Sequence, residues 1–344
     1  MSDTKIKTME EFAAVSGLSR PTVSKYFFDA NSVRPKTRAR IEDAIERYDY
    51  RPNIYAMNQN RRLTRTLGIV VPFLADPFFA EFARIIERLC IDAGFRPIVF
   101  SSHGEPDLEA ENLKSLLAMK PSGALLAPLG RLSDRAALVN FTAEVPSILF
   151  DSNMDGIGEG FVGLDNNQSI GTIVRYLCES GQPPSFFEGK MAPNPNVQSK
   201  LEAYTQSMKQ LGHEPHIVYA EGEGWDFESI GYNAGIRALQ ARDFPTNTIL
   251  CGNDRLAVGF LAAAYEEGLR VGRGDGCALR VAGHDDHPFS RFTCPPLTTV
   301  SQDFDAIASK SVELLIGLFD DRTERPTERQ TTLFDGRLVI RASA

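Results

Sequence analysis

The sequence has few of the features that mark secreted or membrane-spanning proteins. Its 344 residues contain five cysteines, which are widely spaced and form no C-x-x-C pair. We therefore expect reduced side chains rather than a disulfide framework. No apolar run approaches the roughly 20 residues that a membrane-spanning helix needs. The first residues, Met-Ser-Asp-Thr-Lys, lack the apolar stretch of a signal peptide. These absences predict a cytoplasmic protein.

Motifs of catalysis and metal binding are also missing. The chain contains neither the G-x-S-x-G nucleophile elbow nor a P-loop. Two histidine pairs, His213 with His216 and His284 with His287, lack both the i,i+4 spacing and the third ligand that a zinc site usually shows. We therefore expect no metal, no cofactor and no enzyme activity.

What is present is an uneven distribution of charge. Residues 1–66 contain thirteen Lys and Arg against eight Asp and Glu, a net charge of about +5, whereas the whole chain carries −8. Residues 67–344 therefore carry about −13. A small basic head on an acidic body predicts that the head alone meets the phosphates of DNA, since phosphate neutralisation supplies most of the sequence-independent affinity.

The basic head contains the signals of two consecutive capped helices. Thr8 and Glu11 form a capping-box pair that starts the first helix. Gly17 can adopt the left-handed conformation that ends a helix, Ser19 caps the next one, and Pro21 lies in its first turn. This arrangement predicts a helix-turn-helix, which places its second helix in a DNA major groove.

Apolar spacing extends this unit to three helices. Val15, Leu18 and Val23 predict a seam between the first two helices. A third helix is expected from about Pro35 to Tyr48, because Ile41, Ala44, Ile45 and Tyr48 share one face. We predict a headpiece over residues 1–52 and a hinge helix or linker over residues 53–66, which begins after Pro52.

From residue 67 onward, short apolar strands alternate with amphipathic helices. We expect strands over residues 67–73, 95–100, 123–127, 146–150, 185–188, 216–220, 248–251 and 278–282, and helices over residues 78–93, 107–119, 133–141, 168–179, 197–211, 228–241 and 255–267. This alternation predicts parallel sheets with crossover helices, and two such series predict two lobes with a ligand cleft at the carboxyl ends of the strands. The expected fold is an N-terminal all-α headpiece plus an α/β body of two parallel-sheet lobes over residues 67–344. We assign residues 67–165 and 297–344 to the first lobe and residues 166–296 to the second. Within the tail we expect a helix over residues 304–320 and one strand over residues 331–340.

Polar and aromatic side chains mark the expected cleft. Asp151, Asn253 and Asp285 each follow a predicted strand, where they would either contact a ligand or cap the next turn. Phe78, Phe79 and Trp225 are candidates to stack on a sugar face, although the two phenylalanines fit a core nearly as well. The weaker candidates for the cleft are Asp76, His103, Asn196 and Gln302.

The chain resembles the lactose-repressor/galactose-repressor (LacI/GalR) family of bacterial transcription regulators along its whole length. In the head the resemblance rests on Ala13, Val15, Gly17, Ser19, Thr22-Val23-Ser24-Lys25, Lys36-Thr37-Arg38 and Tyr50-x-Pro52-Asn53. In the body it rests on Gly68-Ile69-Val70-Val71-Pro72, Asp76-Pro77-Phe78-Phe79, Asp151, Asp165-Asn166, Gly252-Asn253-Asp254-x-x-Ala257-x-Gly259, Gly283-x-Asp285-Asp286 and Pro295-Pro296-Leu297-Thr298-Thr299-Val300-x-Gln302.

The resemblance implies a repressor whose operator affinity is controlled by a small effector bound between two lobes. It implies a periplasmic-binding-protein fold, a homodimer, a roughly palindromic double-stranded operator, and a hinge helix that enters the minor groove. It places base reading on Arg20, Pro21 and Lys25. The full set of implied DNA-binding residues is Ser19, Arg20, Pro21, Thr22, Ser24, Lys25, Asn53, Tyr55, Ala56, Met57 and Gln59.

Three positions depart from the family pattern. Gln59 stands where the family usually has a leucine that wedges between base pairs, which leaves Met57 or Tyr55 to supply the wedge. Phe28 stands where the family often has Asn. Lys200 occupies an effector-binding Arg position, and an ammonium there fits a carboxylate, a phosphate or a different arrangement of hydroxyls. The expected effector is thus a sugar or a sugar acid or phosphate.

A second function remains open on the sequence alone. The chain could be a sugar-sensing protein that does not bind DNA and uses its headpiece for another partner. Gln59 favours this alternative, whereas the basic head and its intact turn favour the DNA-binding regulator.

Overall fold

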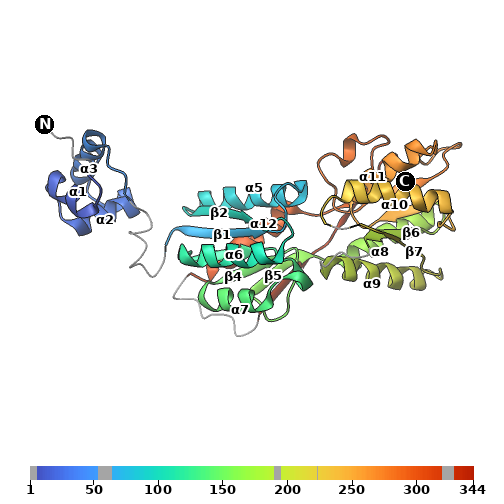
Figure 1. Cartoon of the computed structure of the whole chain (residues 1–344), viewed down its shortest axis with the longest axis horizontal. Helices are drawn as coiled ribbons and strands as arrows, with labels where there is room; N and C mark the ends of the chain where they lie inside the picture. The colour runs from blue at the N-terminus through green and yellow to red at the C-terminus, as the bar shows by residue number, and fades with distance from the viewer. Residues whose placement is uncertain (1–5, 53–63, 190–194, 223, 320–328) are drawn as a thin grey trace. The chain divides into compact units, whose positions relative to one another are not determined.

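The computed structural model describes residues 6–52, 64–189, 195–222, 224–319 and 329–344. The chain forms two compact units, Met1–Thr64 and Arg65–Ala344 (Figure 1). Within the described ranges, no helix is both long and apolar enough to cross a membrane.

The first unit is a small helical headpiece. Its helices are α1 (Met9–Ser16), α2 (Arg20–Phe28) and α3 (Pro35–Tyr48), with a 3₁₀ turn, η1 (Ala30–Ser32), between the last two. They enclose a core made of Phe12, Ala13, Val23, Ile41, Ala44 and Tyr50. The predicted third helix and its buried face are confirmed.

The expected caps of the headpiece are all present. The Thr8 hydroxyl accepts the Glu11 N–H at 3.1 Å, and the Glu11 carboxylate accepts the Thr8 N–H at 3.1 Å. Gly17 has a φ of 62°, the left-handed conformation that its lack of a Cβ makes inexpensive. The Ser19 hydroxyl accepts the Thr22 N–H at 3.4 Å. The turn between α1 and α2 is therefore set by local sequence.

The predicted seam between α1 and α2 is wrong in one member. Val15 is 45% exposed, whereas Phe12, Ala13 and Ser16 are buried. The core-facing stripe of α1 is therefore set by the spacing of residues 12, 13 and 16, and Val15 lies outside it.

The first lobe of the body is a six-stranded parallel sheet in the order β11-β5-β4-β3-β1-β2. Helices α5 and α12 cover one face, and α6 and α7 cover the other. The elements are β1 (Thr66–Val71), α5 (Pro77–Asp92), β2 (Arg96–Ser101), α6 (Pro106–Ala118), β3 (Gly123–Leu126), η2 (Gly130–Leu132), α7 (Arg135–Glu144), β4 (Ser147–Phe150), β5 (Gly160–Leu164), α12 (Phe304–Gly317) and β11 (Gln330–Phe334).

The second lobe is a four-stranded parallel sheet in the order β7-β6-β8-β9. Helices α10 and α11 pack on one face and α8 and α9 on the other. The elements are α8 (Asn166–Ser180), β6 (Ser185–Gly189), α9 (Pro195–Gln210), β7 (Ile217–Ala220), α10 (Phe227–Ala241), β8 (Thr248–Cys251), α11 (Asp254–Glu266), β9 (Arg280–Ala282) and η3 (Ser290–Phe292).

Three strands differ from the sequence-based expectation. Strand β5 is absent from the expected elements, because its sequence, Gly-Phe-Val-Gly-Leu, is short and interrupted by glycine, which weakens the signal of a strand. The three-residue strand β10 (Thr299–Ser301) is absent as well. The single strand expected over residues 331–340 is two strands, β11 and β12 (Arg337–Val339), separated by Asp335 and Gly336.

Residues 297–344 are divided between the two lobes. The sequence-based expectation assigned all of them to the first lobe. Strand β12 pairs antiparallel with β10, and Thr298, next to β10, is bridged to Ala282 at the end of β9. Ala344 is buried in the core of the second lobe, where its carbonyl accepts the Tyr176 hydroxyl at 3.1 Å. Residues 337–344 therefore close the second lobe, where the Ser343 hydroxyl also donates to the Val281 carbonyl of β9 at 2.6 Å.

Candidate functional site

The headpiece presents the predicted base-reading residues on the exposed side of α2. Arg20, Pro21 and Lys25 are exposed, while Thr22 and Ser24 are half-buried. Ser19 lies at the amino end of α2, where its hydroxyl is 2.8 Å from that of Thr22. This face can offer cationic donors to base edges and hydroxyls to phosphates.

One of these cations has a partner within the headpiece. Arg20 Nε lies 2.5 Å from a Glu10 carboxylate oxygen in an exposed ion pair. An exposed pair of this kind contributes at most about 1 kcal/mol, so it can be exchanged for a DNA contact at little cost. Lys25 is the stronger candidate for direct readout.

The hinge residues named above lie outside the described residues. These are Asn53, Tyr55, Ala56, Met57 and Gln59, and their roles stay predictions. Phe28, which departs from the family pattern, is 39% exposed at the end of α2.

A cavity of about 820 Å³ lies between the two lobes of the body. Its volume falls within the usual range for small-molecule sites. All eleven residues that the sequence analysis placed in the cleft line this cavity: Asp76, Phe78, Phe79, His103, Asp151, Asn196, Lys200, Trp225, Asn253, Asp285 and Gln302. Their contact with an effector stays a prediction.

Both lobes contribute to the cavity through the carboxyl ends of their strands. Asp151 follows β4 of the first lobe, whereas Asn253 and Asp285 follow β8 and β9 of the second. Asn253 also caps α11, since its side-chain oxygen accepts the Leu256 N–H at 2.8 Å. The two roles considered for Asn253 are therefore compatible, because the cap uses the side-chain oxygen and a ligand can be met by the amide N–H₂.

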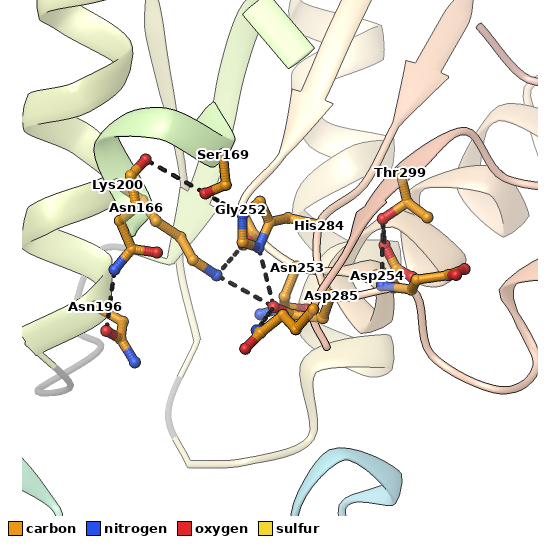
Figure 2. A network of polar contacts seen from close by, with 12 residues as sticks. Asn166, Ser169, Asn196, Lys200, Gly252, Asn253, Asp254, His284, Asp285 and Thr299 are labelled. Atoms are coloured by element: carbon orange, nitrogen blue, oxygen red, sulfur yellow. Dashed lines mark hydrogen bonds and ion pairs between the residues drawn. The ribbon is translucent and has the colours of Figure 1, made fainter. Parts of the chain in front are cut away.

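Lys200 lies on the floor of the cavity inside a polar network (Figure 2). Its ammonium donates to the Gly252 carbonyl at 2.9 Å and lies 3.6 Å from a carboxylate oxygen of Asp285. The same carboxylate accepts from Gln302 at 2.9 Å and lies 2.9 Å from His284 Nδ1. The network thus joins helix α9 to the ends of β8 and β9.

Electrostatics keep Asp285 ionised. Burial alone would raise its pKa, but Lys200 and the His284 imidazole outweigh burial and hold the pKa well below its usual value. Burial lowers the pKa of His284, so its ring is neutral near pH 7. The other ring nitrogen of His284 lies 3.1 Å from the Ser169 hydroxyl, which fixes the ring in place (Figure 2).

Glu188, at the end of β6, is a cavity residue that the sequence analysis missed. Its side chain is buried, and Gly252 approaches it so closely that a Cβ there would lie 1.8 Å from a carboxylate oxygen. Burial raises the pKa of Glu188 to about 7, against the opposing effects of Lys200 and the Gly189 N–H. The floor of the cavity therefore contains one ionised carboxylate and one that titrates near neutrality.

We expect Glu188→Gln to stabilise the body at alkaline pH. Between about pH 4.3 and 7, Glu188 is protonated in the folded protein but ionised in the unfolded chain. The free energy of unfolding of the wild type therefore falls as the pH rises through this window. The variant should become more stable than the wild type across this window, by up to about 3 kcal/mol above pH 7. Urea unfolding at several pH values measures this. The exposed Glu144→Gln is the control, and parallel curves for Glu188→Gln and wild type would contradict the assignment.

A buried ion pair connects the lobes across the cavity. Arg255, in the first turn of α11, donates to a carboxylate oxygen of Asp76 at 3.0 Å, and Asp76 caps α5 of the first lobe. The exposed fractions of these side chains are 10% and 6%. Arg255 also forms a two-pronged pair with Glu228 of α10, at 2.7 and 2.5 Å. The described conformation is therefore held closed by charge as well as packing.

Further contacts across the cleft involve predicted residues. The Asn196 amide donates to the carbonyl and the carboxylate of Asp151 at 3.1 and 3.0 Å. Trp225, in the second lobe, packs against Phe73 and Phe79 of the first, with ring centroids 6.1 and 6.0 Å apart. These groups would separate if the lobes opened.

Comparison with known proteins agrees with this geometry. Residues 8–53 match the family described as "Bacterial regulatory proteins, lacI family", and residues 175–344 match a "Periplasmic binding protein-like domain". The chain therefore combines a head of the lacI family of bacterial regulatory proteins with a periplasmic-binding-protein-like body. This confirms the resemblance drawn from the sequence.

Several relatives align with most of this chain. The ribose operon repressor of Escherichia coli (strain K12) is 28% identical over 329 residues, which is 95% of this chain and 96% of that protein. The structure of the lac repressor dimer bound to operator and the anti-inducer ONPF superposes with a TM-score of 0.81 at 24% identity, covering 98% of this chain and 99% of that one. A lacI-family regulator from Enterococcus faecium with bound ribose gives a TM-score of 0.68 at 19% identity, covering 81% and 98%. The two structures establish the fold, and these relatives are regulators rather than enzymes.

Proposed function

We propose that this lacI-family protein is a transcriptional repressor that binds operator DNA as a homodimer and responds to a small hydroxylated effector. The observation that carries the proposal is the pairing of a capped helix-turn-helix with a two-lobed body whose cavity gathers all eleven predicted residues. The basic headpiece supports the DNA-binding half.

The body supports an effector-controlled switch. An effector can shift an equilibrium only by binding one state more tightly than another. The cavity meets this requirement, because Asp151 lies in one lobe while Lys200 and Asp285 lie in the other. A ligand that touches both lobes stabilises the closed arrangement, and closure would change the spacing of the two hinge segments in the dimer. One relative is named as a repressor of the ribose operon, and one similar solved structure contains bound ribose, which supports a carbohydrate effector.

Selection from random double-stranded DNA tests the proposal directly. We expect a pseudo-palindromic motif whose half-sites lie about one helical turn apart, and a dimer in sedimentation with the selected DNA. A thermal-shift screen of sugars then identifies the effector, since a ligand at about a hundred times its Kd stabilises by roughly 2.7 kcal/mol. Failure to enrich any motif would favour the alternative, a sugar-sensing protein that does not bind DNA.

Lys25→Ala should relax sequence discrimination at one symmetric pair of operator positions. A bidentate contact to guanine contributes about 1–3 kcal/mol of discrimination, and Lys25 is exposed on α2. Repeating the selection with the variant measures this, and Asn53→Ala is the comparison because we assign it a phosphate contact that weakens all sequences alike. An unchanged motif for Lys25→Ala would show that another face of α2 reads the bases.

A further inference from the structure

The charges that line the cavity restrict the effectors that it can hold. Among the described residues, six lining side chains are carboxylates, whereas Lys200 and Arg255 are the two lysine or arginine side chains. The carboxylates are Asp76, Glu105, Asp151, Glu188, Asp226 and Asp285. His103 and His287 also line the cavity, and burial lowers the pKa of His287, so that ring adds no charge near pH 7.

Both cations already have partners in the protein. Lys200 lies 3.6 Å from Asp285 and donates to a backbone carbonyl. Arg255 directs Nε and one terminal nitrogen to Glu228 and the other terminal nitrogen to Asp76. An anionic effector would therefore have to displace a carboxylate that is held by a buried ion pair.

Negative charge also extends to the aromatic part of the cavity. Asp226 directly follows Trp225 in the sequence. Gly104, which directly precedes Glu105, packs so closely on the indole that a Cβ there would lie 2.1 Å from Trp225 Nε1. Even with Glu188 protonated, five carboxylates face two paired cations. Burying an anion here costs its hydration, and among the described lining residues neither lysine nor arginine is left to pair with it, whereas hydroxyls can donate to these carboxylate oxygens.

We propose that the cavity excludes anions and that the effector is a hydroxylated compound without negative charge. This reverses the expectation of a sugar acid or sugar phosphate that Lys200 suggests when its partners are unknown. The identity of the ligand as an effector rests on the proposed function, but the sign of the charge in the cavity does not.

The single tryptophan of the chain provides a ligand-free test, because Trp225 lines the cavity and is partly exposed. Its fluorescence is quenched with cesium, iodide and uncharged acrylamide, each normalised to free N-acetyltryptophanamide. We expect cesium to quench at least about twofold more effectively than iodide at low ionic strength, because lining charges change local ion concentrations. The preference should disappear in about 1 M salt, where the Debye length is about 3 Å. Equal quenching, or stronger quenching by iodide, would overturn the proposal.

Variants test whether the carboxylates of the cavity cause the preference for cesium over iodide. The double variant Glu105→Gln with Asp226→Asn should bring the cesium-to-iodide ratio towards one, and the Asp226→Asn change keeps a side-chain oxygen that can cap the Ser229 N–H. The matched control is Glu144→Gln with Glu179→Gln, two exposed carboxylates outside the cavity, which should leave the ratio unchanged. A ratio that responds equally to both pairs would mean that net charge, not the cavity, sets the preference, and would contradict the proposal.

Matched ligands test the chemical class. Thermal shifts are compared for glucose, glucosamine, glucuronate and glucose 6-phosphate, for the corresponding galactose set, and for ribose with ribose 5-phosphate. We expect the neutral or the amine member of a set to raise the melting temperature of the protein most. A uronate or phosphate that raises it more than the parent sugar does would overturn the proposal. If no compound stabilises while cesium remains the better quencher, the carbohydrate part of the proposed function is contradicted and the charge of the cavity stands.

Discussion

Replacing Arg255 with methionine is expected to destabilise the body by about 3–5 kcal/mol, the usual cost of breaking a buried ion pair by removing one partner. The loss leaves the Asp76 carboxylate buried without its cation and leaves Glu228 beside it. Urea unfolding of the full chain measures the effect. The control is Arg84→Met, whose exposed ion pair with Glu81 lies within α5, and it should cause no measurable change.

The part of this effect that acts between the lobes can be isolated by a double-mutant cycle. Asp76→Asn removes the charge from the first lobe but keeps an oxygen that can accept the Phe78 N–H at the start of α5. A coupling of about 1–3 kcal/mol between Arg255→Met and Asp76→Asn is expected, because the two side chains are in direct contact. Additive effects would mean that Arg255 stabilises only its own lobe, through Glu228.

Lys200→Met should have a comparably large effect, and one that depends on pH. Asp285 and Glu188 would lose the shared cation that favours their ionised forms. At pH 8 we expect a loss of about 3–5 kcal/mol in the free energy of unfolding. Because protonation of the two carboxyls relieves the unpaired charge, the loss should shrink as the pH falls towards 5. Unfolding curves at both pH values measure it.

The double variant Lys200→Met with Glu188→Gln provides the internal control. It removes the carboxyl that titrates near neutrality, so part of the stability at pH 8 should return. Lys114→Met, on an exposed pair with Glu111, should change nothing. If Lys200→Met lost the same free energy at pH 5 as at pH 8, packing rather than charge would explain the role of Lys200.

The local parts of this fold could be predicted because each rests on a signal within a few residues. Thr8 with Glu11, Gly17 and Ser19 specify the turn of the headpiece through backbone hydrogen bonds that need no distant partner. The helices of the body likewise lie close to their expected ranges, since amphipathic spacing records which face is buried. The strands β5 and β10 escaped prediction because they are short and owe their conformation to neighbouring strands.

The candidate site divides in the same way. Asp151, Asn253 and Asp285 were found because each follows an apolar strand, and the carboxyl ends of parallel strands meet at one edge. Glu188 lies at the end of β6 and carries the same signal, so it could have been found by the same rule. Arg255 carries no comparable signal, because it lies within a helix and its partner Asp76 is 179 residues away.

The sequence by itself determined that this chain is a capped helix-turn-helix on a two-lobed α/β body, and it located eleven of the residues that line the cleft. Those features follow from local hydrogen bonding, from periodicity and from motifs that the family shares. Only the tertiary structure decided what charge the cleft presents. Lys200 suggests an anionic effector when it stands alone in the sequence, but in the fold it faces Asp285 and Glu188. The net charge of a site depends on every charged side chain that folding brings near it. Many of these side chains are far apart in the sequence, so the spacing of residues along the chain does not reveal that net charge.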